Sequence, residues 1–180
     1  MSVSPALTVY IVRHGETDAN LNKIIQGHLD VPLNDTGRSQ AHLLSQSLRD
    51  VPFTRAWSSD LQRASATAEE VLKEHPTVKL TKDVALRERF LGQWQGKSVA
   101  ERHAASKADA DGRSIEPPSK LRARLMEWWS NNITTYATQS TNEHVLVLSH
   151  GYAISILFQS LIKEGVIACA PVFIRAALGD

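Results

Sequence analysis

Two histidines that lie far apart in this chain have the same setting, because each follows a short apolar segment and precedes a glycine. The first is His14, which comes directly after Arg13, and the second is His150. A neutral imidazole held by a hydrogen bond to its other nitrogen is a good phosphoryl acceptor and needs no metal. A following glycine lets the backbone approach an anion closely, and arginine offers a planar fork of donors that fits phosphate. These residues therefore indicate phosphoryl transfer through histidine.

Further charged residues complete the site that this chemistry needs. Arg63, in the first turn after a predicted strand, is placed to offer a second guanidinium group. Two arginines and a protonated His150 could neutralise the phosphoryl oxygens in place of Mg²⁺, so we expect no metal and no other cofactor. A proton donor for the leaving alcohol is also needed. We choose Glu88, because its apolar neighbours and the turn-forming Gly92 indicate a pocket wall that keeps the carboxyl group partly protonated.

The elements that must position these residues alternate along the chain. Residues 7–12 form an apolar run without a polar face, which is typical of a strand buried on both sides of a parallel sheet. Further strands are predicted at residues 56–58, 78–80 and 144–148, and helices at 36–51, from about 60 to 72, after a cap at Ser119, and from 151 to about 163. We expect an α/β fold, a three-layer sandwich whose mostly parallel central sheet is flanked by helices. Because such sheets bind ligands at the carboxyl ends of their strands, neighbouring strands would bring both histidines into one site.

The composition excludes several other classes of protein. The chain has 180 residues, 20 Lys and Arg against 19 Asp and Glu, and a net charge of +1. This length predicts a single domain over residues 1–180. The near-zero net charge gives no overall electrostatic field that would attract nucleic acid or an anionic membrane. The longest apolar stretch, residues 166–174, is far shorter than the ~20 residues that span a bilayer. One cysteine, Cys169, excludes an internal disulfide and fits a reducing, cytoplasmic location. Nothing fixes the oligomeric state.

Five motifs occur in a fixed order: VRHGET at residues 12–17, QGHLDVPLNDTG at 26–37, WSSDLQRA at 57–64, LRE at 86–88 and SHG at 149–151. In these motifs the chain resembles the histidine phosphatase superfamily, also called the phosphoglycerate mutase-like family, from Leu7 to about Ile162. The resemblance implies that His14 is the nucleophile that becomes phosphorylated. It implies that Glu88 is the general acid and later the base that activates water. The residues it assigns to holding the phosphoryl group or to the pocket around it are Arg13, Arg63, His150, Asn20, Gln26, Gly27 and Gly151.

The motifs around residues 23–27, 86–89 and 95–97 look most like the TIGAR-like branch, whose assigned activity is fructose-2,6-bisphosphatase. Phosphoglycerate mutases normally carry a longer basic and aromatic lid, which has no equivalent between Gly96 and Ser119. The resemblance therefore favours hydrolysis of a small phosphorylated metabolite, such as a sugar bisphosphate or a phosphoglycerate. A phosphoglycerate mutase-type phosphotransferase and a catalytically impaired phospholigand-binding protein remain the alternatives.

The chain also departs from the family pattern. Pro117-Pro118-Ser119 stands where relatives have a Gly-Gly-Glu turn, and the C-terminal end is shorter than usual. Residues 97–120 are expected to be a lid or insertion loop that recognises the substrate. Arg87 and Arg89 could bind a second anionic group or form an exposed pair. We expect Trp128 and Trp129 in the core, with one ring near the surface.

Overall fold

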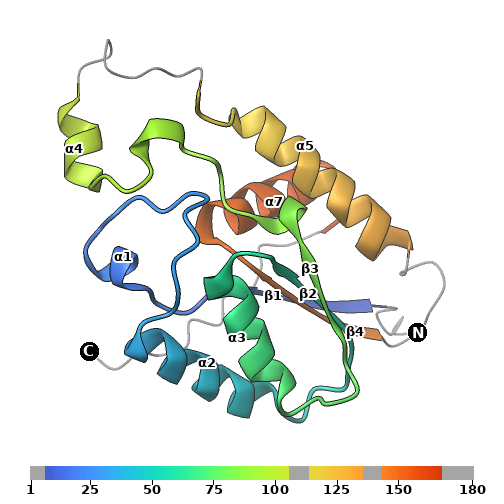
Figure 1. Ribbon diagram of the computed structural model, residues 1–180. Coiled ribbons are helices and arrows are strands. Elements are labelled where there is room, and N and C mark those ends of the chain that lie inside the picture. Colours follow the sequence, from blue (N-terminus) through green and yellow to red (C-terminus); the bar gives the residue numbers. More distant parts are fainter. Residues whose placement is uncertain (1–6, 106–113, 136–142, 168–180) are drawn as a thin grey trace.

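The structure, a computed structural model, describes residues 7–105, 114–135 and 143–167. Within these residues the central sheet has four strands, all paired in parallel, in the order β1-β4-β2-β3 (Figure 1). The strands are β1 (Leu7–Arg13), β4 (Glu143–Ser149), β2 (Phe53–Ser59) and β3 (Leu80–Asp83). Because β1 and β4 are neighbours and Arg13 pairs with Ser149, both histidines follow strands that end at the same edge of the sheet.

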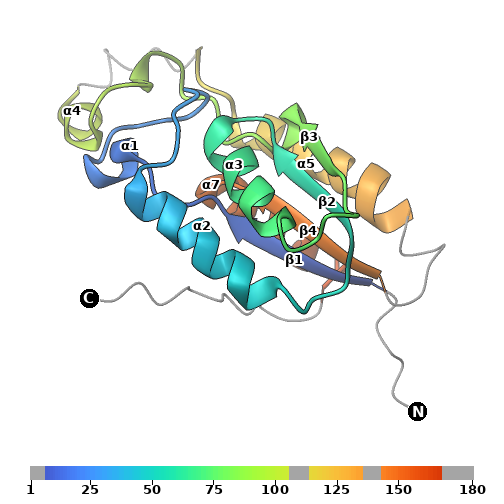
Figure 2. The same ribbon diagram turned by 60° about the horizontal axis from the view of Figure 1, so that its bottom comes forward.

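Helices cover the two faces of this sheet, as Figures 1 and 2 show. The covering helices are α2 (Asp35–Leu48) and α3 (Gln62–Leu72) on one face and α5 (Pro118–Trp129) and α7 (Gly151–Lys163) on the other. A hydrophobic core lies on each face of the sheet, and strand β4 contributes to both because its side chains alternate between the faces. Val145 and Val147 pack with α5 and α7, whereas Leu146 and Leu148 pack against α2 and α3. The predicted three-layer α/β sandwich is confirmed.

Short elements connect these layers near the carboxyl edge of the sheet. They are α1 (Asp18–Leu21), the 3₁₀ turns η1 (Val84–Leu86) and η2 (Gly92–Trp94), and α4 (Val99–Ala104). The π-helical turn η4 (Ser130–Thr134) extends α5 at its C-terminal end. Helix α4 begins with a capping box between Ser98 and Glu101. Among the residues that the structure describes, no helix is long and apolar enough to cross a membrane.

Several details of the predicted elements are wrong. Strand β1 is only half-buried, since it forms an edge of the sheet within the described residues. Strand β3 begins at Leu80 rather than at residue 78. Helix α5 begins at Pro118, whose missing N–H is tolerated in the first helical turn, so Ser119 is not its cap.

The tryptophans of α5 are a further correction. Both rings are buried, with 3% of Trp128 and 8% of Trp129 exposed, because α5 packs on the sheet where Trp57 meets Trp128 edge to face. The predicted lid falls partly outside the described residues, since 106–113 are not among them. The C-terminal end, which the resemblance to the family predicted to be short, and Cys169 also lie outside them.

Candidate active site

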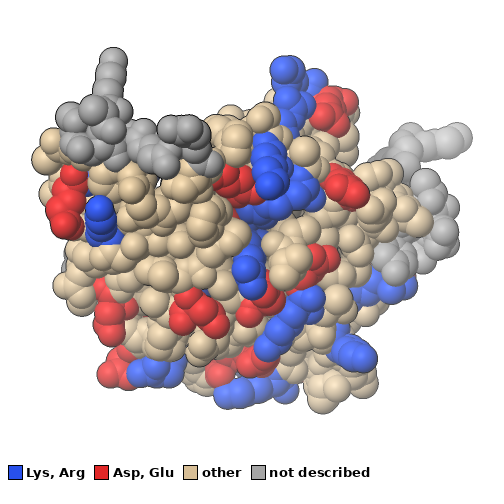
Figure 3. Space-filling model, turned by 45° about the horizontal axis from the view of Figure 1, so that its top comes forward, with Lys and Arg blue, Asp and Glu red and all other residues tan. Residues whose placement is uncertain are grey.

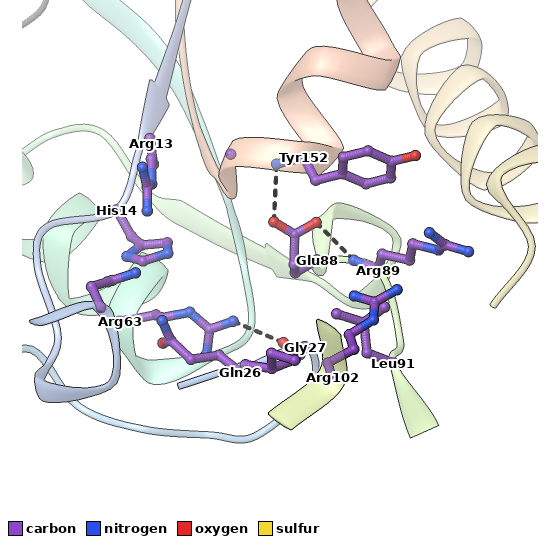
Figure 4. Close-up of a pocket in the computed structure, with 13 residues that line it drawn as sticks. Arg13, His14, Gln26, Gly27, Arg63, Glu88, Arg89, Leu91, Arg102 and Tyr152 are labelled. Atoms are coloured by element: carbon purple, nitrogen blue, oxygen red, sulfur yellow. Dashed lines mark hydrogen bonds between the residues drawn. The ribbon is translucent and has the colours of Figure 1, made fainter. Parts of the chain in front are cut away.

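A cavity of about 470 Å³ opens at the carboxyl edge of β1 and β4 (Figure 4). All the predicted site residues except His150 line this cavity: Arg13, His14, Asn20, Gln26, Gly27, Arg63, Glu88 and Gly151. The other lining residues are Ile25, Arg89, Leu91, Arg102 and Tyr152. Figure 4 shows His14 and Glu88 on opposite sides of the cavity. The fold thus brings together side chains from the first, middle and last parts of the sequence.

His14, the first residue after β1, is held as a neutral imidazole. Its Nδ1 lies 2.7 Å from the carbonyl oxygen of Gly15, and since a carbonyl only accepts, Nδ1 carries the hydrogen and Nε2 keeps a free lone pair. Burial, together with the charges of Arg63 and Arg13, lowers the pKa of His14 to about 3, against the opposing effect of the Gly15 hydrogen bond. The imidazole is therefore unprotonated at neutral pH and can act as a nucleophile through Nε2.

The loop that carries His14 is packed directly against the first turn of α2. A Cβ atom on Gly15 would lie 2.5 Å from the carbonyl oxygen of Gly37, and one on Gly37 would lie 2.0 Å from that of Glu16. The N–H of Gly15 donates to Oγ1 of Thr67 on α3. Glycine at position 15 is thus required by the close approach of α2, a reason additional to the approach of an anion.

His150 lies behind His14 and is fully buried, with the two ring centroids 5.1 Å apart. Neither ring nitrogen of His150 has a hydrogen-bond partner among the described residues. Burial, with Arg63 and His14 nearby, lowers the pKa of His150 well below its usual value. The expectation that His150 is protonated is therefore wrong, because desolvation penalises the charged ring. A neutral imidazole still offers one N–H donor to a phosphoryl oxygen.

The two predicted arginines differ in their surroundings. Arg63, only 1% exposed, donates from Nη1 to the carbonyl of Leu29 and from Nη2 to that of Gly27. Its buried Nε has no partner within the described part of the chain. Burial lowers the pKa of Arg63 to about 10, so the guanidinium remains charged at neutral pH. Arg63 therefore holds the pocket rim and keeps its charge beside the cavity. Arg13 lies beside Gly151 at the start of α7.

Glu88 lies in the pocket wall, as predicted, but the N-terminus of α7 holds its carboxylate with N–H donors, and the apolar surroundings expected for this group are not found among the described residues. The N–H of Tyr152 donates to Oε2 at 3.0 Å, and that of Ala153 donates to Oε1 at 3.1 Å. Oε1 also accepts the N–H of Arg89. The first N–H groups of a helix have no partner inside the helix, and the helix dipole favours a negative charge there. Three donors thus set where the carboxylate sits relative to His14.

The predicted rim residues are organised by Thr17, a fully buried residue that the sequence did not single out. Its backbone N–H donates to Oδ1 of Asn20, and its hydroxyl lies within hydrogen-bond distance of both that oxygen and Oε1 of Gln26. Gly27 adopts a positive φ of 51°, as the turn at the rim requires. Thr17 thus orients two amide side chains that line the cavity.

Arg89, for which the sequence left open an anion-binding role or an exposed pair with Arg87, lines the cavity, and so do Arg102 and Tyr152, which the sequence did not assign to the site. The guanidinium of Arg89 lies 5.7 Å from the ring centroid of Tyr152, a cation–π arrangement. Arg102 comes from α4, inside the segment predicted to recognise substrate, so its position in the sequence was a usable signal. Arg87, by contrast, forms a two-pronged ion pair with Asp60 and does not line the cavity.

The charged residues that line the cavity are four arginines and one glutamate. Acidic and basic side chains are interspersed over the face drawn in Figure 3, in keeping with the net charge of +1. The positive charge of the cavity is therefore local, which suits a small anionic ligand.

This fold and this cavity, with a neutral histidine facing a carboxylate among arginines, define an α/β enzyme of the phosphoryl-transfer class. Residues 9–169 match the family model of the histidine phosphatase superfamily (branch 1). The chain therefore belongs to the histidine phosphatase superfamily and is a phosphatase enzyme, as the motifs indicated.

Individual relatives agree with this assignment. A probable phosphatase of Schizosaccharomyces pombe is 32% identical over 88% of this chain and 75% of its own length. The fructose-2,6-bisphosphatase TIGAR B of Danio rerio is 30% identical over 86% of this chain and 74% of its own. The solved structure of a phosphoglycerate mutase from Bacillus anthracis is 28% identical with a TM-score of 0.77, covering 89% of this chain and 82% of that one.

Proposed function

We propose that this protein hydrolyses phosphomonoesters of small metabolites through a phosphohistidine on His14, without a metal. The observation that carries the proposal is the pairing of the neutral His14 imidazole with Glu88 across a cavity lined by arginines. A free Nε2 lone pair is a phosphoryl acceptor, and fixed cations can neutralise the transferred group as Mg²⁺ does elsewhere.

The reaction has two steps in this proposal. Nε2 of His14 attacks phosphorus, the bond between phosphorus and the alcohol oxygen breaks, and the protonated Glu88 carboxyl gives its proton to that oxygen. A water molecule then attacks the phosphohistidine while Glu88 accepts its proton, the P–N bond breaks, and inorganic phosphate leaves. Arg13, Arg63 and the N–H of His150 stabilise the phosphoryl oxygens in both steps.

Phosphate release in the presence of EDTA tests this proposal. We expect inorganic phosphate from at least one member of a panel of p-nitrophenyl phosphate, 3-phosphoglycerate, 2,3-bisphosphoglycerate and fructose-2,6-bisphosphate, at a rate that EDTA leaves unchanged. Strong inhibition by EDTA would contradict the arginine-based site. Conversion of one phosphoglycerate into another without phosphate release would favour a mutase, the alternative that the Bacillus anthracis structure keeps open.

The outer part of the cavity supports a substrate with a second anionic group, such as fructose-2,6-bisphosphate. Arg89 and Arg102 lie on the side of Glu88, away from Arg13 and His14 (Figure 4). A phosphoryl group bound next to His14 would leave these two guanidinium groups for another phosphate or carboxylate. Fructose-2,6-bisphosphatase activity, after which the Danio rerio relative is named, acts on a substrate of this kind.

Removing one of these cations should change the affinity for one kind of substrate. We expect Arg102→Met to raise KM for fructose-2,6-bisphosphate by about 10 to 100-fold, the effect of one charge-assisted hydrogen bond, and to leave p-nitrophenyl phosphate nearly unaffected. Arg38→Met, which removes an exposed arginine of α2, is the control. Steady-state kinetics would give KM for both substrates. An equal rise of KM for the two would exclude a second anion site at Arg102.

A further inference from the structure

The segment that carries Glu88 has little regular structure of its own. Glu88 lies between the turns η1 and η2, and residues 87–91 belong to no helix or strand. Backbone carbonyls in such a segment need partners from elsewhere in the molecule. Helix α5 packs beside η1 and supplies them.

One side chain of α5, Arg124, binds two carbonyls of this segment and one of the preceding turn η1. Its Nη1 donates to the carbonyl of Ala85 at 2.6 Å and to that of Arg87 at 2.9 Å, and its Nη2 donates to the carbonyl of Glu88 at 2.9 Å. The remaining donors go to Glu116, from Nε to Oε1 at 2.8 Å and from Nη2 to Oε2 at 3.0 Å. A guanidinium group has five N–H donors in a fixed plane, and these contacts use all five.

Glu116 secures the other end of the same segment. Its Oε2 accepts the N–H of Phe90, its own N–H donates to the carbonyl of Phe90, and its carbonyl accepts Nε of Arg89. The Glu116 side chain is 8% exposed and that of Arg124 is 20% exposed, so water competes little for these bonds. Arg124 and Glu116 together hold the backbone on both sides of Glu88.

We propose that Arg124 is a positioning residue that sets the place of the Glu88 carboxyl group for proton transfer to the leaving oxygen. Arg124 does not line the cavity, and its hydrogen bonds reach the site through the Glu88 segment. Its charge also acts on His150, and a lysine at this position keeps that charge. A displacement of about 1 Å at a reacting group can cost roughly 100-fold in rate. The inference rests on the proposed role of Glu88 as general acid.

The leaving group distinguishes this role from a merely structural one. Nitrophenolate departs from p-nitrophenyl phosphate as an anion without help, whereas the alkoxide of 3-phosphoglycerate needs a proton. A misplaced Glu88 should therefore slow phosphoenzyme formation from the alkyl ester much more than from the aryl ester. General loss of structure would slow both to a similar degree.

The test measures the first turnover by rapid quench for the wild type, Arg124→Lys and Glu116→Gln on both substrates. Lysine keeps the charge but cannot make five planar hydrogen bonds. We expect Arg124→Lys to lower the rate of phosphoenzyme formation by at least about 30-fold with 3-phosphoglycerate and by no more than about 3-fold with p-nitrophenyl phosphate. Glu116→Gln should also slow the reaction of 3-phosphoglycerate more than that of p-nitrophenyl phosphate. If Arg124→Lys does not fold, as judged by thermal unfolding, Glu116→Gln decides.

Arg122→Lys is the matched control. Arg122 lies on the same helix and forms an exposed ion pair with Glu164, so this substitution should leave both rates within about 2-fold. Equal losses on the two substrates in a folded Arg124→Lys variant would overturn the positioning role while leaving the proposed function intact. If the wild type does not use 3-phosphoglycerate, the alkyl phosphate of the substrate panel that it does use takes its place. A wild-type enzyme that forms no phosphoenzyme from any member of that panel would overturn the proposed function, and this inference with it.

Discussion

The variant His14→Ala is expected to lose phosphate release by about 10⁴-fold or more. The reason is chemical: alanine has no lone pair at the position where Nε2 faces the cavity, and no other described side chain takes its place. The neighbouring arginines remain, so the variant should still bind phosphorylated ligands. Steady-state phosphate release with EDTA present, together with titration of inorganic phosphate, measures both properties.

A second buried histidine offers a matched control for this experiment. His75 is 8% exposed, as is His14, but it packs against Phe53 at the amino end of β2 and does not line the cavity. His75→Ala should reduce stability, as thermal unfolding would show, and leave the rate per folded molecule nearly unchanged. Turnover by His14→Ala at more than about 1% of the wild-type rate would contradict a histidine nucleophile.

The variant Glu88→Gln is expected to slow the hydrolysis of alkyl phosphates by about 10² to 10⁴-fold, the usual contribution of general acid–base catalysis. Glutamine has nearly the shape of glutamate, yet its amide neither donates a proton to the leaving oxygen nor accepts one from water. Its NH₂ group replaces one of the two oxygens, so it would face either the N–H of Tyr152 or the N–H groups of Ala153 and Arg89. The position of the side chain is therefore weakened as well as its chemistry.

Two substrates separate the acid step from the base step of Glu88. The first-turnover release of nitrophenolate needs no acid and should be affected little by Glu88→Gln, while the later turnovers, which need water activation, should be slow. A burst followed by a slow steady state is the expected trace. Glu69→Gln, an exposed substitution on α3, should behave as the wild type does. Normal steady-state rates in Glu88→Gln would show that another group handles the proton.

Much of the fold could be predicted from residue patterns, because a strand buried between parallel neighbours consists of a nearly continuous apolar run. Strand β4 and helix α7 have nearly the predicted bounds, and the meeting of His14 with His150 follows from the pairing of β1 with β4. The start of α5 was less predictable, because both Ser119 as a cap and Pro118 in the first turn obey common preferences.

The features that the sequence did not reveal depend on contacts between distant segments. The low pKa of His150 comes from burial, which its own neighbours in sequence do not determine. Arg63 and Arg124 act largely on backbone carbonyls, and any residue supplies a carbonyl, so no motif marks the partners. Arg102 reaches the cavity only because α4 folds back against residues near Ile24.

The most direct test of the account is to identify the phosphorylated residue during turnover. Wild-type protein mixed with substrate and EDTA, quenched in alkaline denaturant and analysed by mass spectrometry of its peptides, should carry one acid-labile phosphoryl group on His14. That group should form as fast as the enzyme turns over and be absent from His14→Ala. Turnover without a phosphoryl group on His14, or with one on another residue, would contradict the phosphohistidine mechanism.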